Sequence, residues 1–294
     1  MSATMTVLLP KPERSPRALA WRRFARNPLA LIGTLTLLLI VVLTLIAPLI
    51  IPIDPSAIDL AAVRRPPSPD HLLGTDSSGR DVLARMIAGG QVSLTIGFLA
   101  AAIAVCIGAL VGAVAGWFGG TIDAVISRIV DIFLSLPTVL VVIVVAGILG
   151  PSATMLIGII AGLAWPASAR IARGVVLGLR EQEFIQAARV SGSGNWFIIR
   201  RHLLPGVLPP VIVAATLLVS EAVLLESALS FLGAGVRPPQ ASWGNMLTEA
   251  QSLTVLSSMP WLWLPPGIMI ALTVLCAMAV GDGIRDAIDP KRNK

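Results

Sequence analysis

Six long apolar stretches limit the possible folds of this chain more than any other feature. They are residues 29–51, 92–117, 122–149, 152–171, 206–230 and 262–281. A helix of about 20 residues crosses the hydrocarbon core of a bilayer, which is about 30 Å thick. Soluble domains are about 45–50% apolar, whereas this chain is 55% hydrophobic and only 13% charged. We therefore predict an all-α integral membrane protein with six transmembrane helices.

The basic residues predict how these helices are oriented. They gather in residues 1–28, in residues 285–294 and between the fourth and fifth apolar stretches, whereas charge is mixed in residues 52–91. Because Lys and Arg concentrate in cytoplasmic segments, both tails should be cytoplasmic and residues 52–91 external. The net charge of +6 is explained by this topology, so nucleic acid is not an expected partner. The first stretch is too long for a cleaved signal peptide and lacks a following cleavage site.

The external segment 52–91 contains a predicted amphipathic helix that leads into the second span. Asp76 and Arg80, like Asp81 and Arg85, are four residues apart, as in helical ion pairs. The next external segment, after the fifth span, contains Trp243 and is either a docking surface for a soluble partner or an interfacial anchor.

Two patterns concern packing inside the membrane. Gly108, Gly112 and Gly116 recur every four residues, a spacing that lets another helix approach closely. In the third span, Arg128 and Asp131 are three residues apart and are predicted to pair with each other.

Residues 181–205 are the longest polar interruption in the second half of the chain, and they read as a helix, a glycine turn and a second helix. Phe184, Ala187, Ala188 and Ser191 follow helical spacing, and Gly192 and Gly194 end the first helix. Asn195 is the predicted N-cap of the second helix, and Pro205 is its predicted end. The small side chains of the first helix favour close docking of another surface, although two amphipathic helices lying on the membrane would fit the pattern equally well.

Two carboxylates, Glu221 and Glu226, fall inside the fifth span. A carboxylate in the membrane normally faces a cavity or a partner. Glu226 either holds helices together or lines a translocation path, and Glu221 reads as a protonated or hydrogen-bonded structural residue.

Several motifs in the same order resemble permease subunits of ABC importers, in their dipeptide, oligopeptide and nickel branch. These are WRRFARNPLALIG, HLLGTDSSGRDVLAR, LLESALSFLGAGVRPPQASWG and GDGIRDAIDP. Gln186-Ala187-Ala188, then Gly192 and Leu204-Pro205, resembles the EAA signature of these permeases. Gln186 replaces the usual acid of that signature, and His202 stands where isoleucine is usual.

The resemblance implies a type I, MetI-like fold with a transport core at residues 92–284 and cytoplasmic coupling helices. It implies that residues 181–205 contact the ATPase, through Glu183, Gln186, Ala187, Ala188, Gly192, Leu204 and Pro205, and that Glu226 lies at the family's acidic position. It also implies a bacterial inner membrane, a homologous second permease, two cytoplasmic ATPases that bind ATP and Mg, an external substrate-binding protein and transport by alternating access.

The chain itself shows no phosphate-binding loop and no nucleophile elbow or HExxH motif. We therefore expect no catalytic residue, metal site or cofactor in this subunit. A rival class is a self-sufficient transporter or channel that uses Glu221 and Glu226 as an ion or proton relay, but the inverted repeats and broken helices typical of such proteins are not found. A structural or signalling membrane subunit would leave residues 181–205 unexplained. The sequence does not choose among peptides, nickel chelates, opines and related solutes.

Overall fold

The computed structural model describes residues 16–50 and 54–288, which are mostly helical. Five of its helices are long and apolar enough to cross a membrane: α2 (Pro28–Ile50), α3 (Val82–Phe118), α6 (Ala153–Arg180), the continuous helix Asn195–Phe231 that includes α9 (Leu204–Phe231), and α12 (Pro260–Ile288). A bent pair, α4 (Gly120–Ser135) and α5 (Thr138–Leu149), supplies the sixth crossing if it is counted as one span. The predicted fold class is confirmed.

The third predicted span is broken, however, and its prediction as one continuous helix over residues 122–149 was wrong. The axes of α4 and α5 differ by 82°. Leu136, between them, is extended with ψ of 132°, and Pro137 follows it. Proline lacks an amide hydrogen and disfavours helical conformation in the residue before it. An apolar pattern alone does not reveal such a break.

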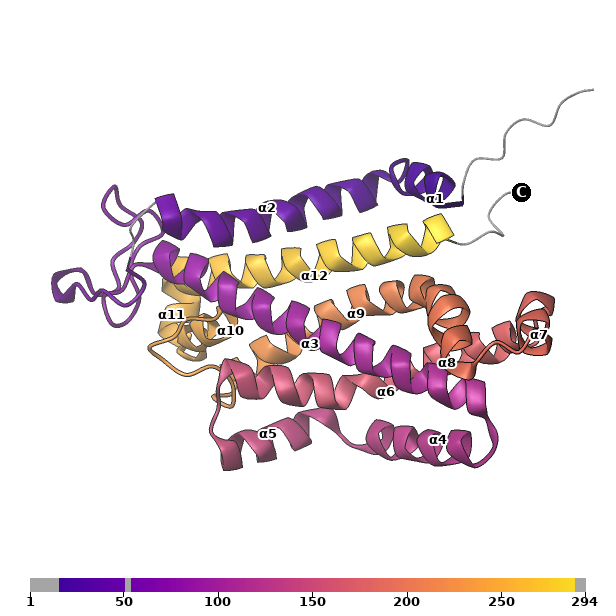
Figure 1. Ribbon diagram of the computed structural model, residues 1–294. Helices are drawn as coiled ribbons and strands as arrows, with labels where there is room; N and C mark the ends of the chain where they lie inside the picture. The colour runs from indigo at the N-terminus through magenta and orange to yellow at the C-terminus, as the bar shows by residue number, and fades with distance from the viewer. Residues whose placement is uncertain (1–15, 51–53, 289–294) are drawn as a thin grey trace, which may run out of the picture.

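Helix α3 lies at the centre of the bundle, where it contacts α6, α9 and α2, while α12 packs between α9 and α2 (Figure 1). At one end of the bundle lie α1 (Pro16–Phe24), the end of α12, α7 (Glu183–Val190) and α8 (Asn195–Ile198). At the other end lie residues 54–81 with η1 (Leu60–Ala62), and α10 (Trp243–Met246), η3 (Leu247–Gln251) and α11 (Leu253–Ser258). We call these the α7 end and the α11 end.

The glycine stripe of α3 packs against α6, as its spacing predicts. A Cβ atom at Gly108 would lie 2.6 Å from the Ser168 Cβ, and one at Gly112 would lie 2.2 Å from the carbonyl oxygen of Ala169. Both distances are too short for a side chain. The two helices are therefore in contact through their backbones.

Helix α4 is held to α6 by two ion pairs. The Arg173 Nη2 atom lies 2.6 Å from Asp123 Oδ2, and Arg170 Nη2 lies 2.7 Å from Asp131 Oδ1. The predicted pair between Arg128 and Asp131 is not formed, because Asp131 faces α6 instead. Sequence spacing identifies neighbours along one helix but not partners on another helix.

At the α11 end, α3 begins at Val82, so Asp76 and Asp81 precede the helix that was predicted to contain them. Asp81 caps α3 by accepting a hydrogen bond from the backbone of Ala84 at 2.8 Å. Asp76 accepts from Arg80 Nε at 2.7 Å and also lies 3.3 Å from Arg85 Nε. Arg85 therefore pairs with Asp76 and not with Asp81.

Trp243 belongs to the interior, so the prediction that it anchors the chain at the membrane interface was wrong, while the docking role of its segment stays a prediction. Its side chain is fully buried, and its indole N–H donates to the carbonyl oxygen of Met86 at 2.9 Å. Residues 231–243 are thereby fastened to the start of α3.

Candidate functional site

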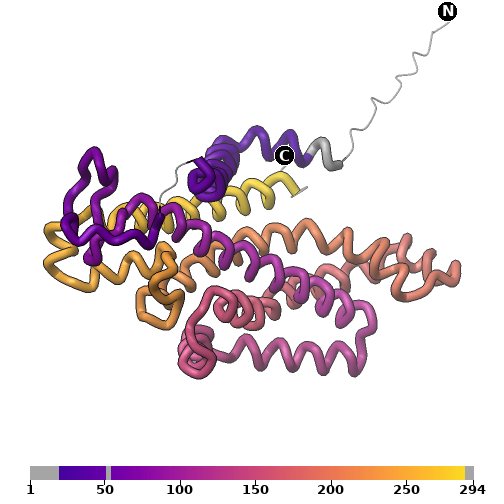
Figure 2. The backbone as a smooth tube through the Cα atoms, turned by 60° about the vertical axis from the view of Figure 1, so that its left-hand side comes forward, coloured from indigo at the N-terminus to yellow at the C-terminus, as the bar shows by residue number. Residues whose placement is uncertain are grey.

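The segment 181–205 forms a helical hairpin that projects from the α7 end (Figures 1 and 2). Helix α7 ends at Val190, and Gly192 follows with φ of +77°. The backbone N–H of Ser193 donates to the carbonyl of Ala188 at 3.1 Å, which closes the turn. A left-handed residue at this place is the usual way for a helix to stop at glycine. The predicted glycine turn is confirmed.

The second half of the hairpin differs from its prediction. Gly194, not Asn195, occupies the N-cap position of α8, and no side chain caps the helix there. The helix also continues through Pro205 into α9 by way of a π-helical turn, η2 (Ile199–Leu203). The π turn leads directly into the first turn of α9, where Pro205 lies. Proline is tolerated in the first turn of a helix. Pro205 therefore does not end the helix.

The inner face of the hairpin is fixed to three spans. Ile185, Ile198 and Leu203 are fully buried, in a cluster that includes Trp117 of α3 and Val176 of α6. Val207 of α9 completes the connection. Because these side chains interdigitate in one core, the hairpin is expected to move with α3, α6 and α9 as one body.

Two polar contacts strengthen this attachment. The Arg189 guanidinium lies 4.1 Å from the centre of the Trp117 ring, which is a cation–π contact. The Gln186 side chain donates to the carbonyl of Arg180 at 3.0 Å, at the end of α6. Gln186 therefore binds this subunit's own backbone, and the hydrogen bond uses the amide nitrogen that the usual acid of the signature would lack.

The outer face of the hairpin is apolar and exposed. Val190 is 89% exposed, Trp196 61% and Phe197 55%. Phe184 is also exposed, on α7. Exposed large apolar side chains of this kind mark a surface that either a partner protein or the membrane covers. We call Phe184, Val190, Trp196 and Phe197 the apolar hairpin face.

The residues predicted to contact a partner divide between these two faces. Ala188 and Leu204 are partly buried against the inner cluster, and five are exposed: Glu183, Gln186, Ala187, Gly192 and Pro205. Val190 and Phe197 were not among the residues predicted from the sequence. The sequence did contain a signal for their exposure. An apolar residue in a polar segment that does not fall on the buried face of its helix is expected to be exposed.

The two membrane carboxylates lie in different surroundings. Glu226 is fully buried and accepts hydrogen bonds from the hydroxyls of Ser93 at 2.8 Å and Ser230 at 2.7 Å. These hydroxyls in turn accept from the backbone N–H groups of Trp243 at 3.2 Å and Val236 at 3.1 Å. Glu226 thus connects α3, α9 and the segment that follows α9.

Glu221 is exposed and lines a cavity of about 190 Å³ between α4, α5, α6 and α9. Thr138, Leu163 and Leu225 are among its other lining residues. No described contact joins Glu221 to Glu226, so the geometry of residues 16–50 and 54–288 gives no support to a relay between them. In the same residues, no group of three or more His, Cys, Asp or Glu side chains is placed to hold a metal ion.

Comparison with known families decides the class of this protein. Residues 104–294 match the model described as binding-protein-dependent transport system inner membrane component, and residues 15–67 match the N-terminal TM domain of oligopeptide transport permease C. The chain belongs to this family of transport permeases. It is a multi-pass membrane permease component of an ABC importer, of the oligopeptide and dipeptide permease C type.

Relatives that align with almost the whole permease have names that agree with this family. It is 43% identical to a putative peptide permease protein of Brucella suis, over 94% of this chain and 91% of the relative. It is 39% identical to the dipeptide transport system permease protein of Alkalihalophilus pseudofirmus, over 94% and 90%, respectively. It is 40% identical to the glutathione transport system permease protein of Shigella flexneri, over 98% and 94%. The family is one of non-catalytic transport subunits, which in general work with a partner permease, an ATPase and a binding protein.

Proposed function

We propose that this permease carries di- or oligopeptides, or a related small solute, across a bacterial inner membrane, and that residues 181–205 couple it to cytoplasmic ATPases. One observation carries the coupling role: the hairpin presents an apolar face outward while its inner face is interlocked with α3, α6 and α9. A surface that only rested on the membrane would not need this attachment. The substrate class is supported by the relatives, which include a putative peptide permease and a dipeptide permease.

The proposed assembly contains a homologous second permease as a heterodimer, two ABC ATPases and an external substrate-binding protein. ATP and Mg would be bound by the ATPases, and this chain would need no cofactor. The α7 end would face the cytoplasm, because basic residues gather there. They are Arg22 and Arg23 of α1, Arg26 just after it, Arg189 of α7, and Arg200 and Arg201 of η2.

In the proposed mechanism the permease alternates between states open to either side. Closure of the ATPases would displace α7, and the buried side chains Ile185 and Ile198 would pass that displacement to the three spans. ATP binding shifts the equilibrium only as far as the ATPases bind one state better than the other. Glu183 and Ala187 are on the exposed side of α7 and would contact the ATPase with the apolar hairpin face.

Val190→Asp should remove the ATPases from the purified complex. It places a charge on the most exposed side chain of the apolar hairpin face, which the ATPase is proposed to cover. Losing such a contact costs about 2 kcal/mol or more, roughly a thirtyfold loss of affinity. The measurement is the amount of ATPase that co-purifies with the tagged permease in mild detergent.

Leu253→Asp is the matched control, since Leu253 is 82% exposed on α11 at the opposite end. This variant should keep its ATPases. Equal retention of ATPases by the Val190→Asp and wild-type permeases would refute the docking role of the apolar hairpin face.

Gly192→Val should uncouple ATP hydrolysis from uptake. A side chain at φ of +77° is strained by about 1–2 kcal/mol, and more for a β-branched residue, although nothing lies within 4 Å of the added Cβ. The turn would relax, and α7 would change its angle to α8. The ratio of solute imported to ATP hydrolysed in proteoliposomes with the binding protein should fall severalfold.

Gly194→Val tests whether the backbone conformation matters and not merely the added bulk. Gly194 also has open space around it, but its φ is −65°, which valine adopts readily. The same coupling ratio in both variants would show that the left-handed turn at Gly192 has no special role.

A further inference from the structure

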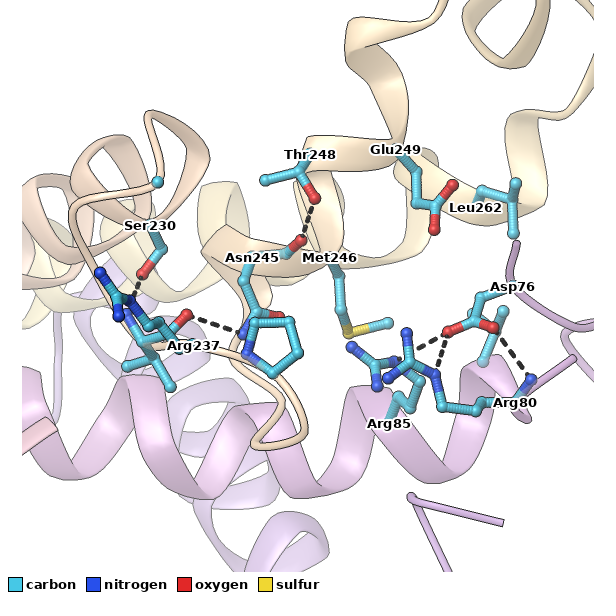
Figure 3. A pocket seen from close by; sticks show the side chains of 14 residues that line it. Asp76, Arg80, Arg85, Ser230, Arg237, Asn245, Met246, Thr248, Glu249 and Leu262 are labelled. Atoms are coloured by element: carbon cyan, nitrogen blue, oxygen red, sulfur yellow. Dashed lines mark hydrogen bonds and ion pairs between the residues drawn. The ribbon is translucent and has the colours of Figure 1, made fainter. Parts of the chain in front are cut away.

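A cavity of about 150 Å³ lies at the α11 end, far from the hairpin (Figure 3). Its walls come from residues 76–85, from the segment after α9, from η3 and from the start of α12. Three arginines and two acids line it: Arg80, Arg85, Arg237, Asp76 and Glu249. The lining therefore has an excess of one positive charge.

Arg85 is the unusual member of this set. Its side chain is only 5% exposed, yet its sole described ion pair joins Nε to Asp76 Oδ2 at 3.3 Å. The Nη1 atom is buried and has no hydrogen-bond partner among the described residues. A guanidinium has five N–H donors, and burying such a charge is costly unless acceptors surround it. The cavity beside Arg85 is where an acceptor can enter.

The two acids in the lining already accept hydrogen bonds from neighbouring residues. The Asp76 carboxylate accepts from the backbone N–H groups of Ser78 at 2.8 Å and Arg80 at 2.9 Å, as well as from Arg80 Nε. Glu249 accepts a hydrogen bond from the Ser77 hydroxyl. Asp76 therefore already has its full share of donors and neutralises Arg85 only in part, while Arg237 adds positive charge at the exposed rim.

We infer that this pocket binds a single carboxylate group, with Arg85 as its direct contact and Arg80 and Arg237 as supporting charges. The planar fork of a guanidinium matches the two oxygens of a carboxylate. Asp76 and Glu249 in the walls would repel a dianion such as phosphate more strongly than a monoanion. The carboxylate would come from a small solute or from an acidic side chain of an external protein.

The test uses the complete transporter in lipid nanodiscs and acetate labelled with ¹³C as the probe. Ligand-observed NMR is recorded with acetate exchanged for chloride at constant ionic strength. Saturable binding of acetate is expected, and Arg85→Gln should weaken it about tenfold or more, since it removes a charge-assisted contact. Arg65→Gln is the matched control, because Arg65 is exposed at the same end but does not line the pocket.

Two further variants keep the inference testable if Arg85→Gln fails to fold. Glu249→Gln removes a negative charge from the wall and should strengthen acetate binding severalfold, whereas Arg237→Gln at the exposed rim should weaken it. A folding defect would not produce shifts of opposite sign. The inference is overturned if the wild type binds no acetate saturably, or if acetate binds equally to wild type and every folded pocket variant.

A second measurement identifies the source of the carboxylate. If acetate competes with the binding protein for the transporter, and Arg85→Gln or Arg237→Gln weakens that association, the carboxylate belongs to the binding protein. If acetate binds without affecting the association, it represents a small solute. This inference does not rest on the coupling role of the hairpin, and Val190→Asp should leave acetate binding unchanged even where ATPases are lost.

Discussion

Replacing Gly112 with valine is expected to prevent folding of the permease. The added Cβ would lie 2.2 Å from the carbonyl oxygen of Ala169 and 2.8 Å from the Ala172 Cβ, so α3 and α6 would have to separate. These two helices share more of the core than any other pair, and overpacking of such a contact costs about 3 kcal/mol or more. Yield of monodisperse protein and its thermal stability in detergent are the measurements.

Gly158→Val provides the comparison. Gly158 is on α6 itself, but nothing lies within 4 Å of a Cβ added there. The intrinsic cost of valine in a helix is below about 1 kcal/mol, so this variant should fold nearly normally. Comparable yield and stability of the two variants would mean that α3 and α6 do not pack through their backbones.

The second large effect is expected from Glu226→Ala. It removes the acceptor of the Ser93 and Ser230 hydroxyls in a fully buried site and leaves a void. Buried hydroxyls left without their acceptor cost about 1–3 kcal/mol each, and the void adds to this, so a loss of roughly 3–5 kcal/mol is expected. The melting temperature of the purified permease should fall clearly, and the segment that carries Trp243 should become sensitive to protease.

Glu221→Ala separates burial from charge, because Glu221 is a carboxylate on the same helix but exposed to a cavity. Its removal should change the melting temperature little. If both alanine variants have the melting temperature of the wild type, Glu226 does not connect the helices as its hydrogen bonds indicate.

The positions of the spans could be predicted because hydropathy reports a local property. The run 29–51 differs from α2 by one residue at either end, and the run 206–230 differs from α9 by only one or two residues, although α9 continues a helix that begins at Asn195. The spacing of Gly108 and Gly112 identifies a close contact before its partner is known. The turn at Gly192 was likewise predictable, since glycine tolerates a positive φ.

The remaining features depend on three-dimensional context. Asp131 has a possible partner three residues away, Arg128, but forms its ion pair with Arg170 on another helix. Pro205 resembles the end of a helix, but it lies in the first turn of α9, which continues directly from a π turn. Trp243 has the pattern of an interfacial anchor, but in the structure it is buried and its indole N–H donates to the carbonyl oxygen of Met86. For the hairpin, the sequence predicted the position of the segment. Which of its side chains face the spans and which are exposed became visible only from the packing in the structure.

The length of α3 has a mechanical meaning. Its 37 residues include no proline, and at 1.5 Å per residue they extend about 55 Å, well beyond the roughly 30 Å of the hydrocarbon core. Arg85 and Ser93 lie in the part of α3 toward the α11 end, and Trp117 lies at its opposite end. Arg189 contacts Trp117, so the proposed displacement of α7 would act on the same helix that carries Arg85. One continuous helix therefore connects the hairpin with the pocket at the α11 end.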